Sequence, residues 1–492
     1  MIVLYIVLGL LAVLIAVMLI RMALFTKHPG EEQAPLDTGA LVNDDEVAAH
    51  LSAVIRCATV SNADMSQMDF GEFEKLHRVL RESYPLVHET MEREQLGGYN
   101  LIYRWKGTDP ARKPICFLSH QDVVPPGDLS KWTYPPFSGY DDGTCIHGRG
   151  AVDMKQQMVL VLDACERLIK EGFTPEEDIY LCFGQNEEVG NRPAGHGADL
   201  IAQTLKERGL RFDCVLDEGG AIISGKTAGV NARIAVVGMA EKGMMGFRLE
   251  CEAAGGHSSR PPKHSALGKV CAAAAYVENH PGKPRLIPLV EDAYKTMAAY
   301  SNNFLLRFAA ANLPLTRGLL AKLLTFTSLT RAMVTNTIAL TQAEGSAQDN
   351  VLPQRAWVGI NSRTLPNVSV DDMQRFFESR VKDKDVRVVN FRGQEKNNIS
   401  RYDTAAFGCL CDTVERFYPG TVVTPYLQLG GSDSKNYYCV SDNVYRFMPV
   451  YLEKGDAAYG VHAVNEYIPK DLLGRGTAFI MHFIKEYKGE KV

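Results

Sequence analysis

The hydrophobic pattern of the chain alternates between two periods from residue 45 to about residue 232. Apolar positions recur at helical spacing in 44–55, 71–83 and 157–171, whereas short apolar runs occupy 100–105, 114–119, 179–183 and 212–216. Runs that are apolar at nearly every position indicate strands buried on both faces of a parallel sheet. The pattern therefore predicts an α/β unit with a mostly parallel sheet that is covered by helices on both faces.

A second pattern begins at about residue 233 and continues to about residue 397. Residues 246–252 alternate as a half-buried strand does, and a helix is predicted over 266–278. Two strands, a helix and a final strand follow, at 335–341, 356–361, 370–380 and 386–391. This βαββαβ order is typical of an antiparallel α+β sheet with helices on one face.

Residues 281–333 exceed what the βαββαβ pattern requires. Two apolar stretches in them, 304–308 and 319–324, predict amphipathic helices. Three interpretations are open: these helices wall a hydrophobic pocket, contact a membrane surface, or thicken the core of the second unit.

The first residues form an uninterrupted apolar run of 19, from Ile2 to Ile20. Roughly 20 apolar residues are enough to cross a bilayer, and the run lacks the positive start and the cleavage site of a signal peptide. We therefore expect a transmembrane anchor over 1–25, in preference to a signal peptide, followed by a short polar linker over 26–44.

The charges around this run favour a cytoplasmic position for the rest of the chain. Arg21, Lys27 and His28 follow the run, whereas only the terminal amine precedes it. Cysteine usage agrees, because Cys116 and Cys182 lie inside apolar strands and the eleven cysteines suggest no disulfide framework.

Composition bounds the class of protein. A chain of 492 residues exceeds the usual size of one hydrophobic core, so two domains are expected. Its hydrophobic content of 46% and charged content of 23% are those of a globular protein. The net charge of −5 and the lack of a basic stripe exclude nucleic acid as a partner.

Five short acidic and histidine-bearing motifs carry the functional signal. They are Ser119-His120-Gln121-Asp122, Gly148-Arg149-Gly150-Ala151-Val152-Asp153-Met154-Lys155, Asn186-Glu187-Glu188-Val189-Gly190, Leu216-Asp217-Glu218-Gly219-Gly220 and Gly460-Val461-His462-Ala463-Val464-Asn465-Glu466. Three of them directly follow predicted strands, and open α/β sheets hold their ligands at the carboxyl ends of strands. Imidazoles and carboxylates are the groups that a pair of hydrolytic zinc ions requires. Each motif alone fits an ordinary loop, helix start, helix cap or turn, but all five in this order indicate one two-metal hydrolase site.

Together these motifs resemble those of the zinc aminoacylase–carboxypeptidase family, over roughly residues 45–488. Within that family, the Ala240-Glu241-Lys242-Gly243 stretch followed by Gly255-Gly256-His257-Ser258-Ser259 is most similar to the carboxypeptidase S and N-acyl-amino-acid hydrolase branch. The resemblance implies a catalytic domain in two parts, 45–232 and 398–492. A lid or dimerisation domain, 233–397, is inserted between them.

The resemblance also implies a role for each residue of the site. The metal ligands are His120, Asp153, Glu188 and His462, with the fifth from Asp217 or Glu218, of which Asp217 is slightly favoured. Asp153 bridges two zinc ions, for which cobalt or manganese are alternatives. Asp122 orients the ring of His120, and Glu187 is the general base that takes a proton from the attacking water.

Further contacts are implied from the lid and a late loop. His257 stabilises the developing oxyanion, in some relatives across a dimer, and Asn336 is another polar contact. Arg363 holds a substrate carboxylate through its planar guanidinium. The backbone amides of Gly430, Gly431 and Ser432 meet the same carboxylate.

The function implied is hydrolysis of the amide bond of small substrates with a free carboxylate. These are dipeptides, C-terminal residues of peptides or N-acyl amino acids. The alternative is a membrane-tethered binding protein of the same fold that has lost catalysis. A homodimer through the lid is a further expectation, and the secreted or vacuolar location of some relatives keeps an extracytoplasmic orientation open.

Overall fold

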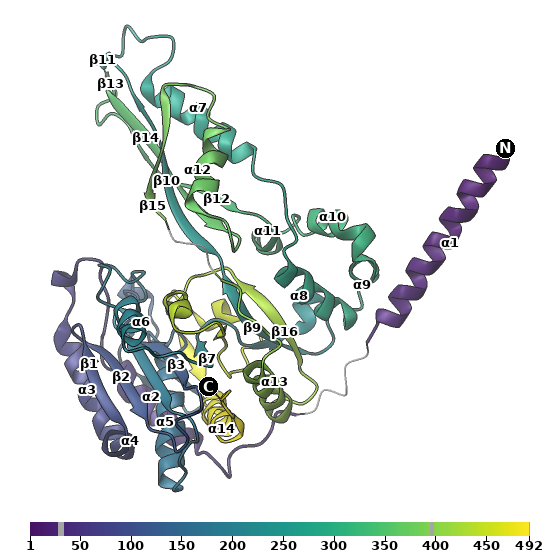
Figure 1. The fold of residues 1–492 in the computed structure, drawn as a ribbon. Helices are drawn as coiled ribbons and strands as arrows, with labels where there is room; N and C mark the ends of the chain where they lie inside the picture. Colours follow the sequence, from purple (N-terminus) through teal and green to yellow (C-terminus); the bar gives the residue numbers. More distant parts are fainter. Residues whose placement is uncertain (28–33, 394–397, 492) are drawn as a thin grey trace.

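The computed structural model describes residues 1–27, 34–393 and 398–491, and shows a body built on a large sheet, a smaller unit that projects from it, called the lid here, and an N-terminal helix that extends away from both (Figure 1). Residues 28–33 of the expected linker and residues 394–397 at the expected end of the lid lie outside the described residues. The N-terminal helix α1 (Ile2–Phe25) contains no buried residue and is long and apolar enough to cross a membrane.

The body is built on a nine-stranded sheet of order β1-β2-β6-β3-β7-β17-β9-β16, with β8 paired to β9. Its strands are β1 (Glu92–Leu96), β2 (Asn100–Trp105), β3 (Ile115–His120), β6 (Ile179–Gly184), β7 (Cys214–Asp217), β8 (Ile222–Ser224), β9 (Arg233–Glu241), β16 (Val422–Gln428) and β17 (Val444–Arg446). Strands β6, β3, β7 and β17 run parallel, as do β9 and β16, but β1, β2 and β8 join in antiparallel fashion and β17 is antiparallel to β9. The expectation of a mostly parallel sheet is thus corrected to a mixed one. The pairs β1–β2 and β8–β9 join strands with no crossover helix between them, and such strands pair in antiparallel fashion.

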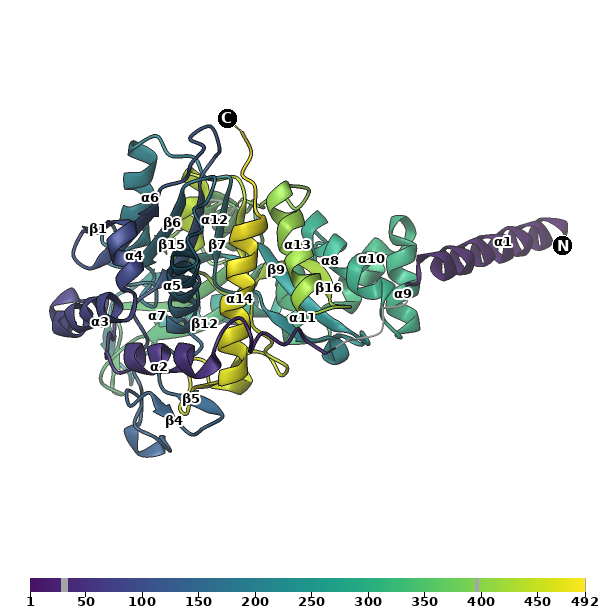
Figure 2. The same cartoon turned by 90° about the horizontal axis from the view of Figure 1, so that it is seen from below.

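Helices cover both faces of this sheet (Figure 2). One face is covered by α2 (Asp44–Ile55), α5 (Lys155–Lys170), α13 (Ala405–Phe417) and α14 (Lys470–Glu486), with α3 (Phe70–Ser83) and α4 (Pro85–Thr90) beside them. On the other face α6 (Ala198–Glu207) packs over Leu118 and Cys182. The start of α2 shows why the sequence begins a helix there: the side chain of Asn43 accepts a hydrogen bond from the Asp45 amide, which satisfies a donor that the helix leaves free.

The lid has the expected βαββαβ order. Its antiparallel sheet, β12-β14-β10-β15, consists of β10 (Gly243–Glu252), β12 (Thr337–Glu344), β14 (Arg355–Thr364) and β15 (Val386–Arg392). Helices α7 (Ala266–Asn279) and α12 (Val370–Glu378) pack on it. Strand β9 lies within the range 233–397 expected for the lid but pairs in the large sheet, so the chain passes from body to lid at Lys242, between β9 and β10.

The remaining strands form two small sheets. Strands β11 (Gly256–His257) and β13 (Val351–Leu352) make a ribbon at the far end of the lid. On the body, β4 (Tyr140–Asp141), β5 (Cys145–His147) and β18 (Tyr467–Pro469) form a sheet of three strands.

The segment between α7 and β12 folds into four helices: α8 (Pro288–Ala299), α9 (Phe304–Ala311), α10 (Leu313–Leu323) and α11 (Ser328–Val334). Helix α8 packs on β16 at the edge of the large sheet, and α9 packs on α8, α10 and α1. These helices therefore stand beside the body and the N-terminal helix (Figure 1) and do more than thicken the core of the lid.

Candidate metal centre

Three neighbouring parallel strands bring most of the candidate residues to one edge of the large sheet. Strand β3 ends at His120, β6 ends at Gly184 and β7 ends at Asp217, and their order β6-β3-β7 makes their carboxyl ends adjacent. Glu187, Glu188 and Glu218 follow these ends within a few residues. The topology thus gathers motifs that are far apart along the chain.

His120 is buried, and its two ring nitrogens have different partners. Nδ1 lies 2.9 Å from the backbone oxygen of Asp122, so Nδ1–H donates there and Nε2 is left to bind a cation. Nε2 lies 3.2 Å from Asp153 Oδ1 and 3.8 Å from Glu218 Oε2. His120, Asp153 and Glu218 therefore form one side of the site.

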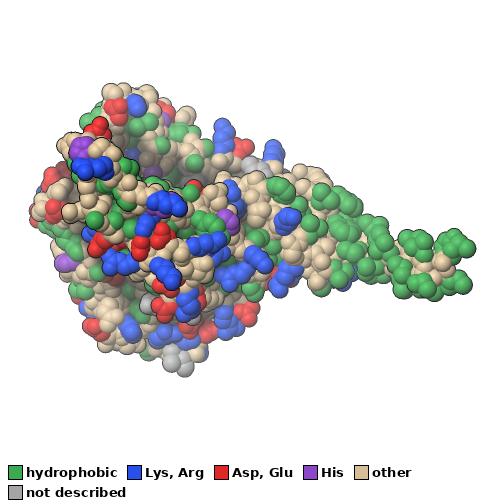
Figure 3. All heavy atoms as spheres, turned by 90° about the horizontal axis from the view of Figure 1, so that it is seen from above, with side chains coloured by type: hydrophobic (Ala, Val, Ile, Leu, Met, Phe, Trp, Pro, Cys, Tyr) green, Lys and Arg blue, Asp and Glu red, His purple; other side chains and the backbone are tan. Residues whose placement is uncertain are grey.

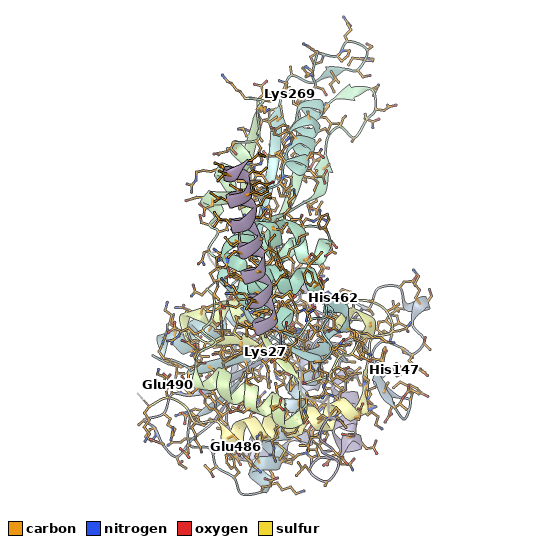
Figure 4. The ribbon with its side chains drawn as sticks, turned by 90° about the vertical axis from the view of Figure 1, so that its right-hand side faces the viewer. Lys27, His147, Lys269, His462, Glu486 and Glu490 are labelled. Atoms are coloured by element: carbon orange, nitrogen blue, oxygen red, sulfur yellow. The ribbon has the colours of Figure 1, made fainter. Side chains whose placement is uncertain are left out.

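His462 completes the other side from the opposite end of the chain. It stands in a turn with φ of 58°, on the part of the body toward the lid (Figure 4). Its Nε2 lies 3.0 Å from both Asp153 Oδ2 and Glu188 Oε2. The two oxygens of Asp153 thus face different histidines, which is the arrangement of a carboxylate shared by two cations.

The donor atoms fit metal ions. Nitrogen and oxygen atoms of His120, Asp153 and Glu188 lie within 4.8 Å of one another, as do those of His120, Glu187 and Glu218. In addition, Oε1 of Glu188 is buried and has no hydrogen-bond partner among the described residues. A buried carboxylate oxygen without a donor is costly, and a cation at this position would satisfy it.

The charges of the cluster also call for cations. Burial, together with Glu218, raises the pKa of Glu187 well above its usual value, and burial with Asp153 does the same for Glu218. Hydrogen bonds that His462 donates to the carboxylates of Asp153 and Glu188 raise the pKa of His462 to about 10. These carboxylates therefore ionise together only with compensating positive charge, from protons or from metal.

The side chain of Asp122 has contacts in addition to the expected one with His120. Its Oδ1 and Oδ2 accept hydrogen bonds from the amides of Glu187 and Glu188, both at 3.1 Å, while its backbone oxygen binds the ring of His120. The carboxylate remains 3.5 Å from His120 Nδ1. Asp122 thus fixes the loop that carries the two glutamates as well as the histidine.

Of the two acidic residues at the end of β7, the structure brings Glu218 and not Asp217 into the cluster. Asp217 Oδ2 accepts a hydrogen bond from the Ser434 amide at 2.7 Å. Asp217 therefore supports the loop after β16. On the sequence alone Asp217 is slightly favoured as the fifth ligand, but it is Glu218 that lies near His120.

Glu466, which ends the last motif, received no role from its sequence. Its buried carboxylate accepts hydrogen bonds from the amides of Gly150, Val152 and Asp153 and pairs with Arg149 Nη1 at 2.7 Å. This ion pair is almost fully buried. Glu466 therefore shapes the loop that presents Asp153. A buried charged residue of this kind cannot be predicted from the hydrophobic pattern of the sequence.

The expected substrate contacts are placed unevenly. Arg363, half-buried on β14, lies where its charge interacts with Glu241 and Glu187, although burial lowers its pKa. Asn336 Oδ1 instead accepts a hydrogen bond from the Leu365 amide inside the lid. His257 is exposed in the ribbon at the far end of the lid, away from the cluster (Figure 1).

The loop after β16 is partly committed to protein contacts. The Ser432 amide donates to Glu241 Oε2 at 2.7 Å, so it already serves a carboxylate of the chain itself. Gly430 and Gly431 are exposed. Among the three residues expected to meet a substrate carboxylate, these two glycines are the accessible ones.

The sequence is similar to those of known proteins over most of its length. Residues 116–486 match the profile of Peptidase family M20/M25/M40. A probable carboxypeptidase S-like protein of Dictyostelium discoideum is 31% identical over 92% of this chain and 86% of its own length. An N-fatty-acyl-amino acid synthase/hydrolase of Danio rerio is 32% identical over 88% of this chain and 83% of its own length.

Solved structures show the same fold at low identity. An M20 family metallo-carboxypeptidase from Sulfolobus solfataricus superposes with a TM-score of 0.67 at 15% identity, over 90% of this chain and 98% of that one. Human carnosine dipeptidase 1 superposes with a TM-score of 0.59 at 16% identity, over 92% of this chain and 99% of that one.

Proposed function

The chain belongs to peptidase family M20/M25/M40, whose members are metal-dependent hydrolases, and on this basis we propose that it hydrolyses the amide bond of small substrates that carry a free carboxylate. The substrates are N-acyl amino acids or the C-terminal residues of short peptides. Both classes are named among the relatives, as N-fatty-acyl-amino acid synthase/hydrolase and as carboxypeptidase S-like protein.

One observation carries the proposal: Asp153 presents one oxygen to His120 and the other to His462, with Glu188 and Glu218 beside them. We assign two zinc ions to this cluster, with cobalt or manganese as alternatives. His120, Asp153 and Glu218 would hold one ion and Asp153, Glu188 and His462 the other. Such ions supply Lewis acidity toward the amide carbonyl and lower the pKa of water.

Glu187 is the residue that moves the proton. The Asp122 carboxylate fixes the backbone of Glu187. The carboxyl group of Glu187 lies beside His120 and Glu218, with one donor atom of each within 4.8 Å of the others. Burial and the neighbouring carboxylate raise the pKa of Glu187, which suits a group that takes a proton from water and returns it to the leaving nitrogen.

Arg363 and the loop at Gly430 and Gly431 select the substrate. Arg363 stands near Glu187 without a carboxylate within ion-pair distance among the described residues, so its guanidinium remains available for the carboxylate of a substrate. His257 is exposed at the far end of the lid and would reach a site only in a second chain, which is how a homodimer through the lid would contribute.

A catalytically inactive, membrane-tethered binding protein is the second candidate. It would require loss of the base or of a metal ligand. Glu187 and every expected ligand position are present in the sequence, and the short distances among His120, Asp153, Glu188, Glu218 and His462 support a metal-binding role for them. The geometry therefore favours catalysis.

The N-terminal helix is proposed as a single-pass anchor. It is 24 residues long, Arg21 is its one charged residue, and none of its residues is buried. The charges after it favour a cytoplasmic body, whereas a cleaved signal peptide would release the body outside the cytoplasm.

The test is hydrolysis by the purified full chain of N-acyl amino acids and of dipeptides, with metal content measured on the same sample. Glu187→Gln is the control variant, since it keeps the shape of the side chain and removes the base. We expect activity that Glu187→Gln abolishes while metal content is unchanged. Full metal loading without activity on any of these amides would instead favour the binding protein.

A further inference from the structure

Large apolar side chains are concentrated on the exposed surface of the helices that stand beside the body. Outside α1, exposed large hydrophobics at Leu41, Leu129, Tyr140, Val351 and Phe391 are scattered. The others all lie between residues 304 and 329, with exposures from 49% to 79%, and we call them the α9–α11 face: Phe304, Leu305, Leu315, Leu319, Phe326 and Leu329. A cluster of this kind on a soluble surface indicates a site of contact.

The α9–α11 face adjoins the N-terminal helix. Met18, Met22 and Phe25 are the half-buried positions of α1, spaced to share one side of the helix, and α1 packs against α9. The side chain of Asn312, between α9 and α10, donates a hydrogen bond to the Met18 backbone oxygen at 3.1 Å. Figure 3 shows apolar side chains continuing from α1 onto the adjoining body.

The depth of this contact along α1 is informative. At a rise of about 1.5 Å per residue, Met18 lies about 24 Å from Ile2, while the hydrocarbon layer of a bilayer is about 30 Å thick. If α1 crosses the bilayer, Met18 is still within the hydrocarbon layer or at its border. Helix α9, which contacts α1, would then lie in the membrane interface.

The charges of the segment fit a phospholipid surface. Residues 300–334 contain Arg307, Arg317, Lys322 and Arg331 and no aspartate or glutamate. Lys322 and Arg331 are exposed and make no ion pair within the described chain. Basic side chains at the rim of an exposed apolar surface are typical of helices that lie in the headgroup region.

We propose that the α9–α11 face is inserted into the same bilayer leaflet that α1 enters, so that the catalytic body lies on the membrane and does not hang from a free tether. The proposal goes beyond the hydrolase function and rests on α1 being the anchor. A tether alone would leave the face in water. Lys27, at the end of α1 (Figure 4), instead donates its amide to the Ala299 oxygen at the end of α8, which ties the anchor to these helices.

The experiment places tryptophan on the face of the full chain, reconstituted in phospholipid nanodiscs with α1 intact by mass. Leu319→Trp and Phe326→Trp probe two separate positions, and both side chains are exposed, so the substitutions disturb no core. Leu129→Trp is the matched control on the catalytic body, where the leucine is 63% exposed. Phospholipids brominated on their acyl chains quench only tryptophan that lies in the hydrocarbon region.

We expect bromolipid quenching of Leu319→Trp and Phe326→Trp to exceed that of Leu129→Trp several-fold. Quenching equal to the control would overturn the proposal. Emission that shifts to the blue with rising protein-to-lipid ratio but is not quenched would overturn it too, because a second copy would then cover the face. Amide hydrolysis measured on the same nanodiscs separates the two proposals. Activity without quenching would overturn only the membrane insertion of the α9–α11 face, and quenching without activity would overturn only the hydrolase function.

Discussion

The carboxylate of Asp122 holds the backbone of Glu187, with Oδ1 3.1 Å from the Glu187 amide nitrogen. Its second oxygen holds the next amide, that of Glu188, at the same distance. One side chain therefore fixes both the proposed base and a proposed metal ligand, and it does so from the strand end that carries His120. The position of Glu187 is thus coupled to the position of His120 through a single residue.

Asp122→Asn should lower kcat by about 10- to 100-fold, the usual effect of losing a partner that orients a metal site. The amide group of asparagine offers only one acceptor, so one of the two glutamate amides loses its bond. Metal content should fall less than kcat. Asp128→Asn, an exposed turn residue that caps Ser130, is the control and should leave kcat unchanged. Equal kcat in both variants would contradict the role given to Asp122.

Glu218→Gln and Asp217→Asn should separate the two candidates for the fifth ligand. Glu218 Oε2 lies 3.8 Å from His120 Nε2, whereas Asp217 Oδ2 is bound to the Ser434 amide. Metal analysis after dialysis should therefore find about one ion lost in Glu218→Gln. Asp217→Asn should keep both ions and change mainly stability, and the reverse result would restore Asp217 as the ligand.

Much of this candidate site could be predicted because each of its motifs is a short stretch of sequence, although the motifs themselves are far apart along the chain. The strand ends at His120 and Asp217 and the helix at 44–55 appear where the pattern places them. The choice between Asp217 and Glu218 was not accessible, since successive residues at a strand end point in opposite directions and a shift of one residue exchanges them.

Other features depend on contacts between distant segments. The bond from Asp122 to the Glu187 amide and the bonds from Glu466 to the Gly150 and Val152 amides use backbone donors, which have no sequence signature. The helices at 304–308 and 319–324 were foreseen, but their exposed face has meaning only beside α1. Packing partners, and not local propensity, decide such roles.

Glu466→Gln should lower the free energy of unfolding by about 3 kcal/mol, because it leaves the guanidinium of Arg149 buried without its counter-charge. The urea midpoint, measured with metal at saturation, checks this. Glu46→Gln is the matched control: its partner Arg167 is near the surface and the pair should contribute less than about 1 kcal/mol. A midpoint shift no larger than that of the control would show that the Arg149–Glu466 pair is not required for the Asp153 loop.

Lys242, at the passage from body to lid, should make stability depend on pH. Its buried ammonium donates to the backbone oxygens of Ala332 and Thr335 at 2.7 and 2.8 Å, and burial with the nearby Arg363 charge lowers its pKa to about 7. Between pH 7 and the ordinary lysine pKa of about 10.5 the unfolded chain binds a proton that the folded chain has released. The free energy of unfolding therefore rises with pH across that window, and below it the penalty for burying the charge is constant.

Lys242→Met removes this contribution. Relative to the variant, the free energy of unfolding of the parent protein should rise between pH 6.5 and 9.5. The rise is on the order of 3 kcal/mol for a lysine pKa of about 7 in the folded chain and about 10.5 in the unfolded chain. Urea midpoints at the two pH values measure the gain, and subtracting the variant cancels the titration of all other groups. Lys106→Met, at an exposed position, is the control and should show no pH-dependent difference. If the difference between parent and Lys242→Met is the same at both pH values, the buried amine keeps its proton throughout, and the two carbonyl oxygens at the end of α11 stabilise the charge enough to offset its burial.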